Sequence, residues 1–429
     1  MAGKRLIIIG GGINGLVLAR ELAAFYSITV LEGQERWGGR INSQLATDGH
    51  TVIEGGAEFI HGKLKHTMDL LDEAEISYAP IEGKMYRRQG GEWVEQDSMM
   101  EGWDRMLEAM AALRQDMTLT EFFDIHFPGE KNTGLRHQAL KFAEGFDLAD
   151  PSRASVMALY KEWTAEQDDN YRIATGYGSL VNYLVTTLKE DAVEMVSGDP
   201  VRQVDWEPHE VRAYTGSGKT YDADLVIVTI PVSTLARAGE TFSINFTPPL
   251  DPQIRAAGEI GMGTIIKFVL EFDSIQWPDD LGFILSDETV PTWWSQLPGR
   301  QPILTGWLGG PAAAKVSDLR DDELVDKALI SLAAILDKTV SELRDRLTAA
   351  HVFNWQKETA VEGGYSYATP RTSTARTFLQ HPVGDTIFFS GEGIYEGSSP
   401  GTVEAAIIQA KKTALQVLQR VIPNKGKEG

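Results

Sequence analysis

Three glycines near the N-terminus are spaced so that a phosphate-bearing ligand could approach the backbone. Gly10, Gly12 and Gly15 form the pattern G-x-G-x-x-G directly after the apolar residues 6–9. Where a strand turns into a helix, the first glycine permits a tight turn and the second admits a pyrophosphate, while the third lets the helix pack on the strand. Glu32 follows Gly12 by twenty positions, where an acid can bind a ribose hydroxyl. The sequence therefore predicts a βαβ unit that binds a dinucleotide.

The residues on either side of this acid extend the predicted ligand site. The N-terminus of a helix presents free N–H groups and a positive dipole end to phosphates, so we expect contacts from Ile13 and Asn14 in the first turn. A second glycine cluster follows the acid, and it consists of Arg36, Gly38, Gly39 and Arg40. These glycines allow another close backbone approach, and an arginine can donate charge-assisted hydrogen bonds to the pyrophosphate.

Composition excludes several classes of protein. The 429 residues include 40 lysines and arginines against 61 acids, a net charge of -21, which disfavours nucleic-acid binding. This charge is compatible with attraction of cationic substrates and also with solubility alone. The chain has no cysteine, so disulfides and thiolate metal sites are excluded, and we expect no metal. No apolar run reaches the roughly 18 residues of a membrane span, and the first strand leaves no room for a signal peptide. We expect a cytoplasmic protein without a membrane anchor.

Further motifs follow in order along the chain. They are residues 55–62 (GGAEFIHG), 176–180, 224–231, 261–267, Trp355, 363–367 (GGYSY), 391–393 and 401–404. Together with the two glycine clusters, this ordered set resembles the flavin-dependent amine oxidase family, which includes monoamine oxidases, polyamine oxidases and histone demethylases. The resemblance implies FAD as the cofactor. Covalent members carry a cysteine where Gly364 stands here, so we expect FAD to be held non-covalently.

The resemblance implies an α/β fold with two interleaved parts. We expect a Rossmann-like FAD-binding domain of the glutathione-reductase type over residues 1–80, 175–250 and 355–429. Residues 81–174 and 251–354 would form an α+β substrate-binding domain with a mixed sheet and helices. The local patterns agree, because hairpin signals flank residues 48–49, residues 101–170 have helical periodicity, and strand character returns after residue 175.

The matching motifs also imply cofactor contacts beyond the two glycine clusters. In the middle of the chain they include Gly56, Ala57, Glu58, Phe59 and Val201, and toward the C-terminus Trp355, Gly391, Glu392, Gly401, Thr402 and Val403. We expect the helix after residue 402 to aim its N-terminus at the flavin.

The reaction implied by the family is oxidation of an amine to an imine, with a hydride equivalent passing to flavin N5. Oxygen then reoxidises the flavin and yields hydrogen peroxide, while water hydrolyses the imine. Lys267 matches the family's flavin-facing lysine, where a cation can stabilise charge formed as electrons reach oxygen. Tyr365 matches one aromatic wall of the substrate cage, which can hold an amine by apolar and cation–π contact. The second wall falls at Thr402, which indicates a longer or bulkier amine.

Two residues of the 55–62 motif could bind a distant ammonium of the substrate. These are Glu58 and His61, and His61 matches a histidine of acetylpolyamine and spermine oxidases. Either side chain could instead cap a turn. Six tryptophans could wall an apolar pocket, namely Trp93, Trp103, Trp163, Trp293, Trp294 and Trp307.

Other functions remain open at this point. A protoporphyrinogen oxidase or desaturase would share the glycine motifs, and an L-amino acid oxidase would need a basic residue for the substrate carboxylate, with Arg172 or Lys65 as possible choices. A flavin-stabilised scaffold without catalysis is a third possibility. The expected partners are a small amine and molecular oxygen, and the sequence does not indicate whether the protein is a monomer or a homodimer.

Overall fold

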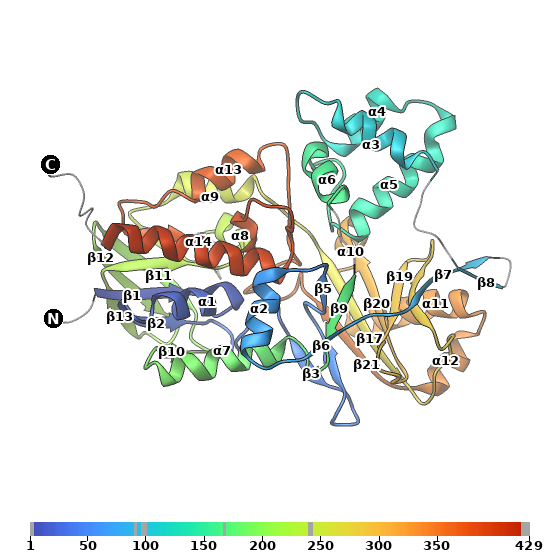
Figure 1. Cartoon of the computed structure of the whole chain (residues 1–429), viewed down its shortest axis with the longest axis horizontal. Helices are drawn as coiled ribbons and strands as arrows, with labels where there is room; N and C mark the ends of the chain where they lie inside the picture. The colour runs from blue at the N-terminus through green and yellow to red at the C-terminus, as the bar shows by residue number, and fades with distance from the viewer. Residues whose placement is uncertain (1–3, 90–91, 96–100, 166–168, 239–242, 422–429) are drawn as a thin grey trace.

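The first strand of the chain lies in the middle of a five-stranded parallel sheet (Figure 1). The computed structural model describes residues 4–89, 92–95, 101–165, 169–238 and 243–421. The strand order is β10 (Glu194–Val196), β2 (Tyr26–Leu31), β1 (Lys4–Ile9), β14 (Leu225–Val228) and β23 (Ile387–Phe389). All neighbouring strands run parallel. The last four residues of β1 and all of β14 are buried, as expected for parallel strands covered on both faces.

Different layers cover the two faces of this sheet. One face packs against four helices, α1 (Ile13–Leu22), α2 (Lys65–Glu73), α7 (Gly178–Glu190) and α14 (Val403–Val421). The other face packs against a four-stranded sheet and three helices. These are β13 (Thr220–Ala223), β12 (Glu210–Thr215), β11 (Val201–Glu207), β15 (Asn245–Thr247), α8 (Val232–Ala236), α9 (Asp251–Gly258) and α13 (Thr372–Leu379).

A seven-stranded mixed sheet forms the second part of the molecule. Its order is β21 (Leu347–Asn354), β17 (Ile265–Phe272), β20 (Ile303–Gly309), β19 (Thr292–Ser295), β18 (Leu281–Leu285), β7 (Lys84–Gln89) and β8 (Glu92–Glu95). Helices α11 (Asp321–Leu336) and α12 (Val340–Arg346) share a hydrophobic core with this sheet, and α10 (Gly310–Ala314) follows β20. All eight residues of β17 are buried, Lys267 among them, so this strand carries a charge into the interior.

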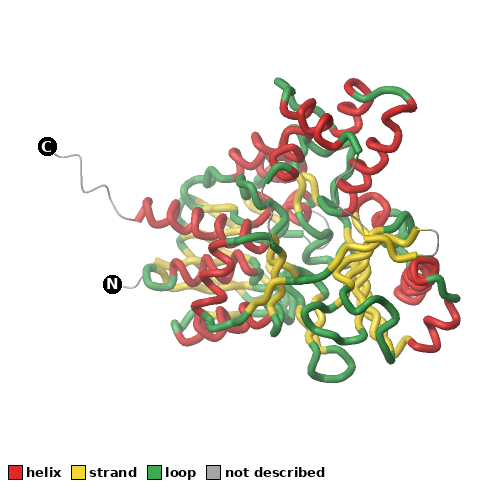
Figure 2. The backbone as a smooth tube through the Cα atoms, turned by 45° about the vertical axis from the view of Figure 1, so that its right-hand side comes forward, coloured by secondary structure: helices red, strands yellow, loops and turns green. Residues whose placement is uncertain are grey.

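A group of short helices stands beside the mixed sheet, and we call it the helical lobe. It contains α3 (Trp103–Ala111), α4 (Leu119–His126), η1 (Glu130–Asn132), α5 (Thr133–Gly145) and α6 (Val156–Trp163). Figure 2 shows it as a group of helices above the strands of the mixed sheet. Short strands connect the parts: β3 (Ser43–Leu45) with β4 (Val52–Glu54), β5 (Phe59–His61) with β9 (Asn170–Ile173) and β6 (Tyr78–Pro80), and β16 (Gly261–Met262) with β22 (Ser366–Tyr367). A 3₁₀ helix, η2, spans Glu392–Ile394.

The predicted fold class is confirmed, with a Rossmann-like parallel sheet and a second part that combines a mixed sheet with helices. The predicted hairpin around residues 48–49 and the mostly helical character of residues 101–165 are present. Residues 166–168 of the predicted helical stretch lie outside the described residues, and at its end the prediction is wrong, because Asn170 begins β9, which pairs with β5 and β6. Within the described ranges, no helix combines the length and the apolar character needed to cross a membrane.

The close approach of α1 to β1 leads to a prediction about Gly15. A Cβ on Gly15 would lie 2.0 Å from the carbonyl oxygen of Gly10, so Gly15→Ala must push the helix off the strand, which costs about 1–3 kcal/mol. We expect its Tm to fall by several degrees. The control is Gly134→Ala in α5, where the added Cβ meets nothing within 4 Å and stability should stay level or rise slightly. Equal Tm values for Gly15→Ala and the unmodified protein would contradict this packing.

Candidate active site

One large cavity runs from the β1–α1 turn to the helical lobe. Its volume is about 910 Å³, near the top of the roughly 300–1,000 Å³ range of ligand pockets. Of the six tryptophans considered for the pocket wall, Trp294 and Trp307 line it, whereas Trp93, Trp103, Trp163 and Trp293 do not. Among the predicted cofactor-binding and catalytic residues, Gly15 and Arg36 do not line it. The others do: Gly10, Gly12, Ile13, Asn14, Glu32, Gly38, Gly39, Arg40, Gly56, Ala57, Glu58, Phe59, His61, Val201, Lys267, Trp355, Tyr365, Gly391, Glu392, Gly401, Thr402 and Val403.

The two glycine clusters lie side by side and form one backbone cradle. Gly12 makes a parallel bridge with Gly38, and a Cβ on Gly12 would meet no atom closer than 3.9 Å. The backbone of the β1–α1 turn is therefore open toward the cavity. Gly10 has a φ of +115°, a conformation that side-chain-bearing residues rarely adopt. A phosphate could approach this cradle as the sequence predicts.

Glu32 lies at the end of β2, on the cavity wall. Its Oε2 accepts a hydrogen bond from the amide of Gly11 at 2.6 Å, and its Oε1 accepts one from the amide of Gln34 at 2.7 Å. Burial raises the pKa of the Glu32 carboxyl, and the backbone donors partly oppose this rise. Each carboxylate oxygen keeps a further lone pair, so Glu32 could also accept hydrogen bonds from a ligand.

The two arginines of the second glycine cluster have different surroundings. Arg36 donates to the carbonyl oxygens of Gly39 and Ile41 at 2.7 and 2.9 Å, so its guanidinium braces its own turn. Its predicted contact with a pyrophosphate stays a prediction. Arg40 lines the cavity and forms an ion pair with Glu392 at 2.8 Å. This pair ties the start of the chain to its C-terminal part.

A buried ion pair joins β17 to the β5 strand region. Lys267 Nζ donates to Glu58 Oε2 at 2.5 Å and to the carbonyl oxygen of Gly56 at 3.1 Å. The side chains of Lys267 and Glu58 are 1% and 6% exposed. An unpaired charge at such depth would cost several kcal/mol, so each residue requires the other. The sequence indicated both residues separately but not this contact.

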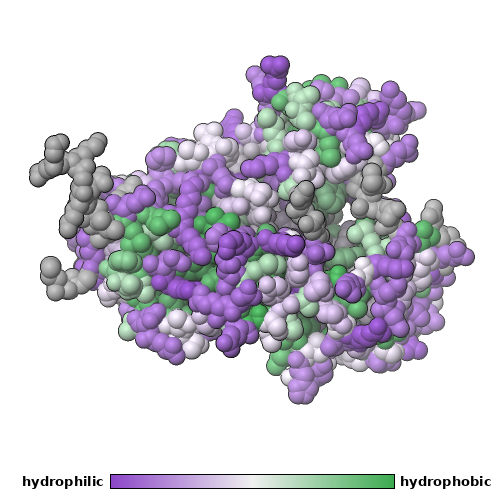
Figure 3. All heavy atoms as spheres, in the orientation of Figure 1, coloured by the Kyte–Doolittle hydropathy of each residue, from purple (hydrophilic) through white to green (hydrophobic). Residues whose placement is uncertain are grey.

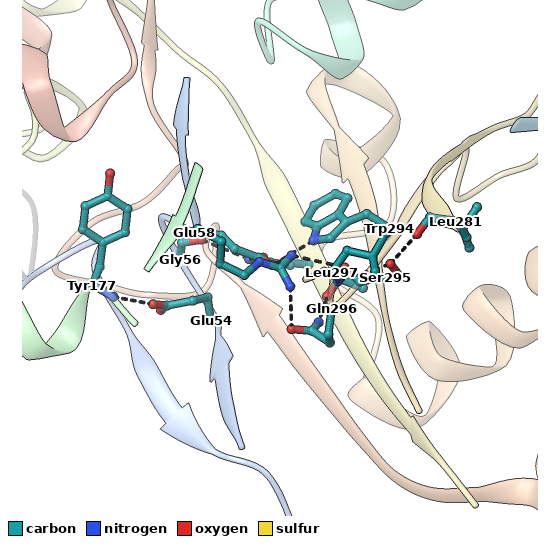
Figure 4. Close-up of polar contacts among 12 residues, drawn as sticks. Glu54, Gly56, Glu58, Tyr177, Leu281, Trp294, Ser295, Gln296 and Leu297 are labelled. Atoms are coloured by element: carbon teal, nitrogen blue, oxygen red, sulfur yellow. Dashed lines mark hydrogen bonds and ion pairs between the residues drawn. The ribbon is translucent and has the colours of Figure 1, made fainter. Parts of the chain in front are cut away.

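Further donors converge on the second oxygen of Glu58 (Figure 4). Glu58 Oε1 accepts from Arg172 Nη2 at 2.7 Å and from Trp294 Nε1 at 2.9 Å. Burial opposes ionisation here, yet the charges of Lys267 and Arg172 hold the pKa of Glu58 below its usual range. Both oxygens of Glu58 are thus engaged by the protein itself, and its predicted contact with a substrate ammonium stays a prediction.

Neither basic residue considered for a substrate carboxylate lines the cavity. Arg172 donates to Glu58, to Gln296 Oε1 and to the carbonyl oxygen of Ser295. Lys65 lies at the surface and pairs with Asp69 at 2.7 Å. The structure therefore gives no support to the L-amino acid oxidase alternative through these two residues.

Tyr365 and Thr402 both line the cavity, beside the N-terminus of α14. The Tyr365 ring lies so close to Gly401 that a Cβ there would meet it at 2.8 Å, and the Tyr365 hydroxyl donates to the carbonyl oxygen of Phe146. Thr402 Oγ1 accepts from the amide of Ala405 at 3.1 Å and donates to the carbonyl oxygen of Ser399, so it caps α14. Its predicted place in a substrate cage is not tested by these contacts.

His61 is held by the neighbouring strand. Its Nδ1 lies 2.8 Å from Asn170 Oδ1, and because an amide oxygen only accepts, Nδ1 is the donor. Burial lowers the pKa of His61, so the ring is neutral at pH 7 and Nε2 is an acceptor. Trp355 closes a nearby wall, where its Nε1 donates to the carbonyl oxygen of Gly55 at 2.8 Å.

Two acids that the sequence did not indicate line the cavity near Tyr365. Asp147 follows Phe146 directly, and Trp163 Nε1 donates to its Oδ2 at 2.9 Å. Burial and the neighbouring Glu162 raise the pKa of Asp147 well above its usual range. Burial likewise raises the pKa of Glu162 to about 7. A nearby cation would stabilise the ionised form of both acids and lower their pKa values. No motif marks them, because they meet only through the packing of α6 against the end of α5.

Comparison with known proteins places this chain in a family. The model of the flavin containing amine oxidoreductase family matches residues 13–418. Polyamine oxidase 2 of Arabidopsis thaliana is 24% identical over 97% of this chain and 89% of its own length. Lysine-specific histone demethylase 2 of Homo sapiens is 24% identical over 96% of this chain, which spans 53% of that protein.

Solved structures show the same fold. The structure of putrescine oxidase bound to putrescine has a TM-score of 0.81 at 19% identity, and the match covers 97% of this chain and 99% of that one. Cyclohexylamine oxidase from Brevibacterium oxydans has a TM-score of 0.79 at 17% identity, with 98% and 99% coverage.

The raised pKa of Glu162 predicts how stability depends on pH. A carboxyl whose pKa is higher in the folded protein binds a proton that the unfolded chain releases, so stability falls as pH rises from about 4.5 to about 7. Glu162→Gln should therefore lose less Tm between pH 5 and pH 8 than the unmodified protein does. Glu130→Gln, at an exposed acid of the same lobe, should keep the original pH dependence. If the two variants lose the same Tm between pH 5 and pH 8, the pKa of Glu162 is not raised in the folded protein.

Proposed function

The chain belongs to the flavin-containing amine oxidoreductase family, and from this membership we propose that it oxidises a primary or secondary monoamine or a polyamine. The overall reaction consumes the amine, oxygen and water, and it yields an aldehyde or ketone, the released amine or ammonia, and hydrogen peroxide. Bound FAD supplies the redox chemistry, since it accepts a hydride equivalent and passes two electrons to oxygen. The observation that carries the proposal is a single cavity that joins the glycine cradle to Lys267 and Tyr365.

The residues of the cavity suit a bound FAD. A Cβ on Gly56 would lie 1.9 Å from the carbonyl oxygen of Arg40, so this wall admits only glycine and stays flat. The cradle at Gly12 would take the pyrophosphate, Glu32 the adenosine ribose, and the start of α14 the flavin. Because Gly364 precedes Tyr365 and the chain has no cysteine, we propose that FAD is held without a covalent bond.

The two acids near Tyr365 would receive the substrate as an ammonium ion. Amines carry a proton at neutral pH, but hydride can leave only from the neutral amine. Glu162 has a pKa of about 7, which suits a group that accepts this proton. The Tyr365 ring would hold the apolar carbons beside the nitrogen, and His61 Nε2 could accept a hydrogen bond from the amine.

The ion pair of Lys267 and Glu58 would serve the second half of the reaction. Negative charge forms when electrons pass to oxygen, and a fixed cation beside that charge lowers its energy. Glu58 and the carbonyl oxygen of Gly56 hold the Lys267 ammonium in place at the cavity wall. Glu58 is therefore proposed as a positioning residue rather than a substrate ligand.

The walls of the cavity favour an amine with a sizeable apolar part. Aromatic side chains from the mixed sheet and the helical lobe line it, namely Phe142, Phe146, Phe283, Trp294 and Trp307. The second cage position is Thr402, which leaves more room than an aromatic would. The printed names of the relatives include polyamine, putrescine and cyclohexylamine oxidases, so both linear and cyclic amines belong among the substrates to be tested.

The direct test is anaerobic bleaching of the yellow flavin by a panel of amines. The panel contains benzylamine, a phenethylamine, cyclohexylamine, putrescine, spermidine, N-acetylspermine and several L-amino acids. We expect rapid bleaching by at least one amine and recovery of the colour with hydrogen peroxide when oxygen is admitted. If no amine bleaches a flavin that dithionite still reduces, the protein acts on another substrate or does not catalyse oxidation.

A further inference from the structure

Four charged or titratable side chains at the outer end of the cavity form a group that we call the rim cluster. Arg87 comes from β7, His137 and Lys141 from α5, and Asp287 from the connection between β18 and β19. All four line the cavity, and their side chains are between 37% and 67% exposed. The rim cluster therefore marks the place where the cavity meets solvent. Figure 3 shows a recess in the surface between the helical lobe and the mixed sheet.

Asp287 is the centre of the rim cluster and links its two sides. Its Oδ2 lies 3.3 Å from Arg87 Nη1, and its Oδ1 lies 3.9 Å from Lys141 Nζ and 4.0 Å from His137 Nε2. One carboxylate thus faces two permanent cations and an imidazole. Glu144, the next acid along α5, interacts with Lys141 and His137 but does not line the cavity. Among the four side chains of the rim cluster, two permanent cations face one carboxylate, although the whole chain carries a net charge of -21.

The length of helix α5 gives an estimate of the distance from the rim cluster to Tyr365. The carbonyl oxygen of Phe146, which directly follows α5, accepts a hydrogen bond from the hydroxyl of Tyr365. Lys141 and His137 lie five and nine residues before Phe146, on α5 itself. At 1.5 Å per residue these positions are about 8 and 14 Å from Phe146. An extended chain rises roughly 3.3–3.6 Å for every three backbone bonds, so about seven to twelve bonds would span this distance.

The two ends of the cavity carry different kinds of group. The inner end carries the acids Asp147 and Glu162, whose pKa values burial raises, while the outer end carries the cations of the rim cluster. The net negative charge of the chain acts on a ligand only from afar, because physiological salt screens charges over about 8 Å. Within the cavity, the nearby charged side chains therefore determine which charged group of a ligand is attracted or repelled. A second ammonium at the outer end would meet Arg87 and Lys141 and be repelled.

We propose that the rim cluster binds an anionic group, such as a carboxylate or a phosphate, at the far end of the amine substrate. This inference rests on the proposed amine oxidation, and it narrows the substrate to an amine with an anion about 8–14 Å from its nitrogen. Arg87 and Lys141 supply the charge, and His137 supplies an additional ring nitrogen. Asp287 keeps the two cations together and competes with the ligand for them.

The test compares three ligands of equal chain length on the FAD-loaded protein. The probes are 8-aminooctanoate, octylamine and 1,8-diaminooctane, which place an anion, a methyl group or a cation at the rim. Anaerobic titration gives the dissociation constant from the change in the flavin spectrum, and the rate of bleaching gives flavin reduction. We expect 8-aminooctanoate to bind more tightly than octylamine and 1,8-diaminooctane to bind more weakly, and both differences should shrink at high salt.

Variants of the rim cluster separate this site from general electrostatics. Arg87→Gln and Lys141→Gln should each weaken the binding of 8-aminooctanoate by about two- to five-fold relative to that of octylamine, the usual size of effect for an exposed ion pair. Asp287→Asn should strengthen the binding of 8-aminooctanoate by a similar factor. Lys131→Gln, at an exposed position of the helical lobe that does not line the cavity, should leave the dissociation constants of both ligands unchanged.

The two hypotheses fail in different ways. If the double variant Arg87→Gln/Lys141→Gln leaves the ratio of the dissociation constants of 8-aminooctanoate and octylamine unchanged, the rim cluster does not bind the anion. If 1,8-diaminooctane binds more tightly than octylamine, the inference is likewise overturned. If the three ligands bind as expected but none of them, nor any amine of the wider panel, bleaches the flavin, then the anion site stands and amine oxidation fails.

Discussion

The buried ion pair between Lys267 and Glu58 is the interaction on which the site depends. Moving either charge out of water costs several kcal/mol, and the pair is tolerable only because further donors complete it. Arg172 and Trp294 supply those donors from β9 and β19. The pair therefore fixes the mixed sheet against the segment that follows the glycine cradle. A cation of fixed position then faces the cavity where the parallel sheet and the mixed sheet meet.

Around this fixed cation the cavity is organised from one end to the other. The glycine cradle and Glu32 form one end, where the parallel sheet presents the carboxyl ends of β1 and β2, the usual place for a ligand in such sheets. Tyr365 and the acid pair lie further along, beside the helical lobe. The rim cluster closes the outer end. Each region draws on separate stretches of the chain, so the fold, rather than any local motif, creates the order of charges.

The sequence predicted what depends on local spacing. The glycine motifs, Glu32 and the parallel sheet follow from patterns within short segments. The ordered motifs indicated the family, and Lys267 was indicated only through that resemblance. Contacts between distant segments could not be read in this way. Glu58 and Lys267 are 209 positions apart, and Asp147 meets Glu162 only because α6 packs near the end of α5. Arg36 has the residue type of a phosphate ligand, but its guanidinium instead braces the carbonyl oxygens of its own turn.

The measurement that tests the central claim most directly is the reaction of the reduced flavin with oxygen. Stopped-flow mixing of the reduced protein with oxygen should show a rate constant at least about ten-fold lower in Lys267→Met, since one well-placed stabilising group is worth this much or more. Glu58→Gln should slow the reaction as well, because Lys267 loses its anchor. Lys189→Met, at an exposed lysine of α7, should match the unmodified protein. An unchanged rate constant in a folded, FAD-loaded Lys267→Met protein would contradict the account.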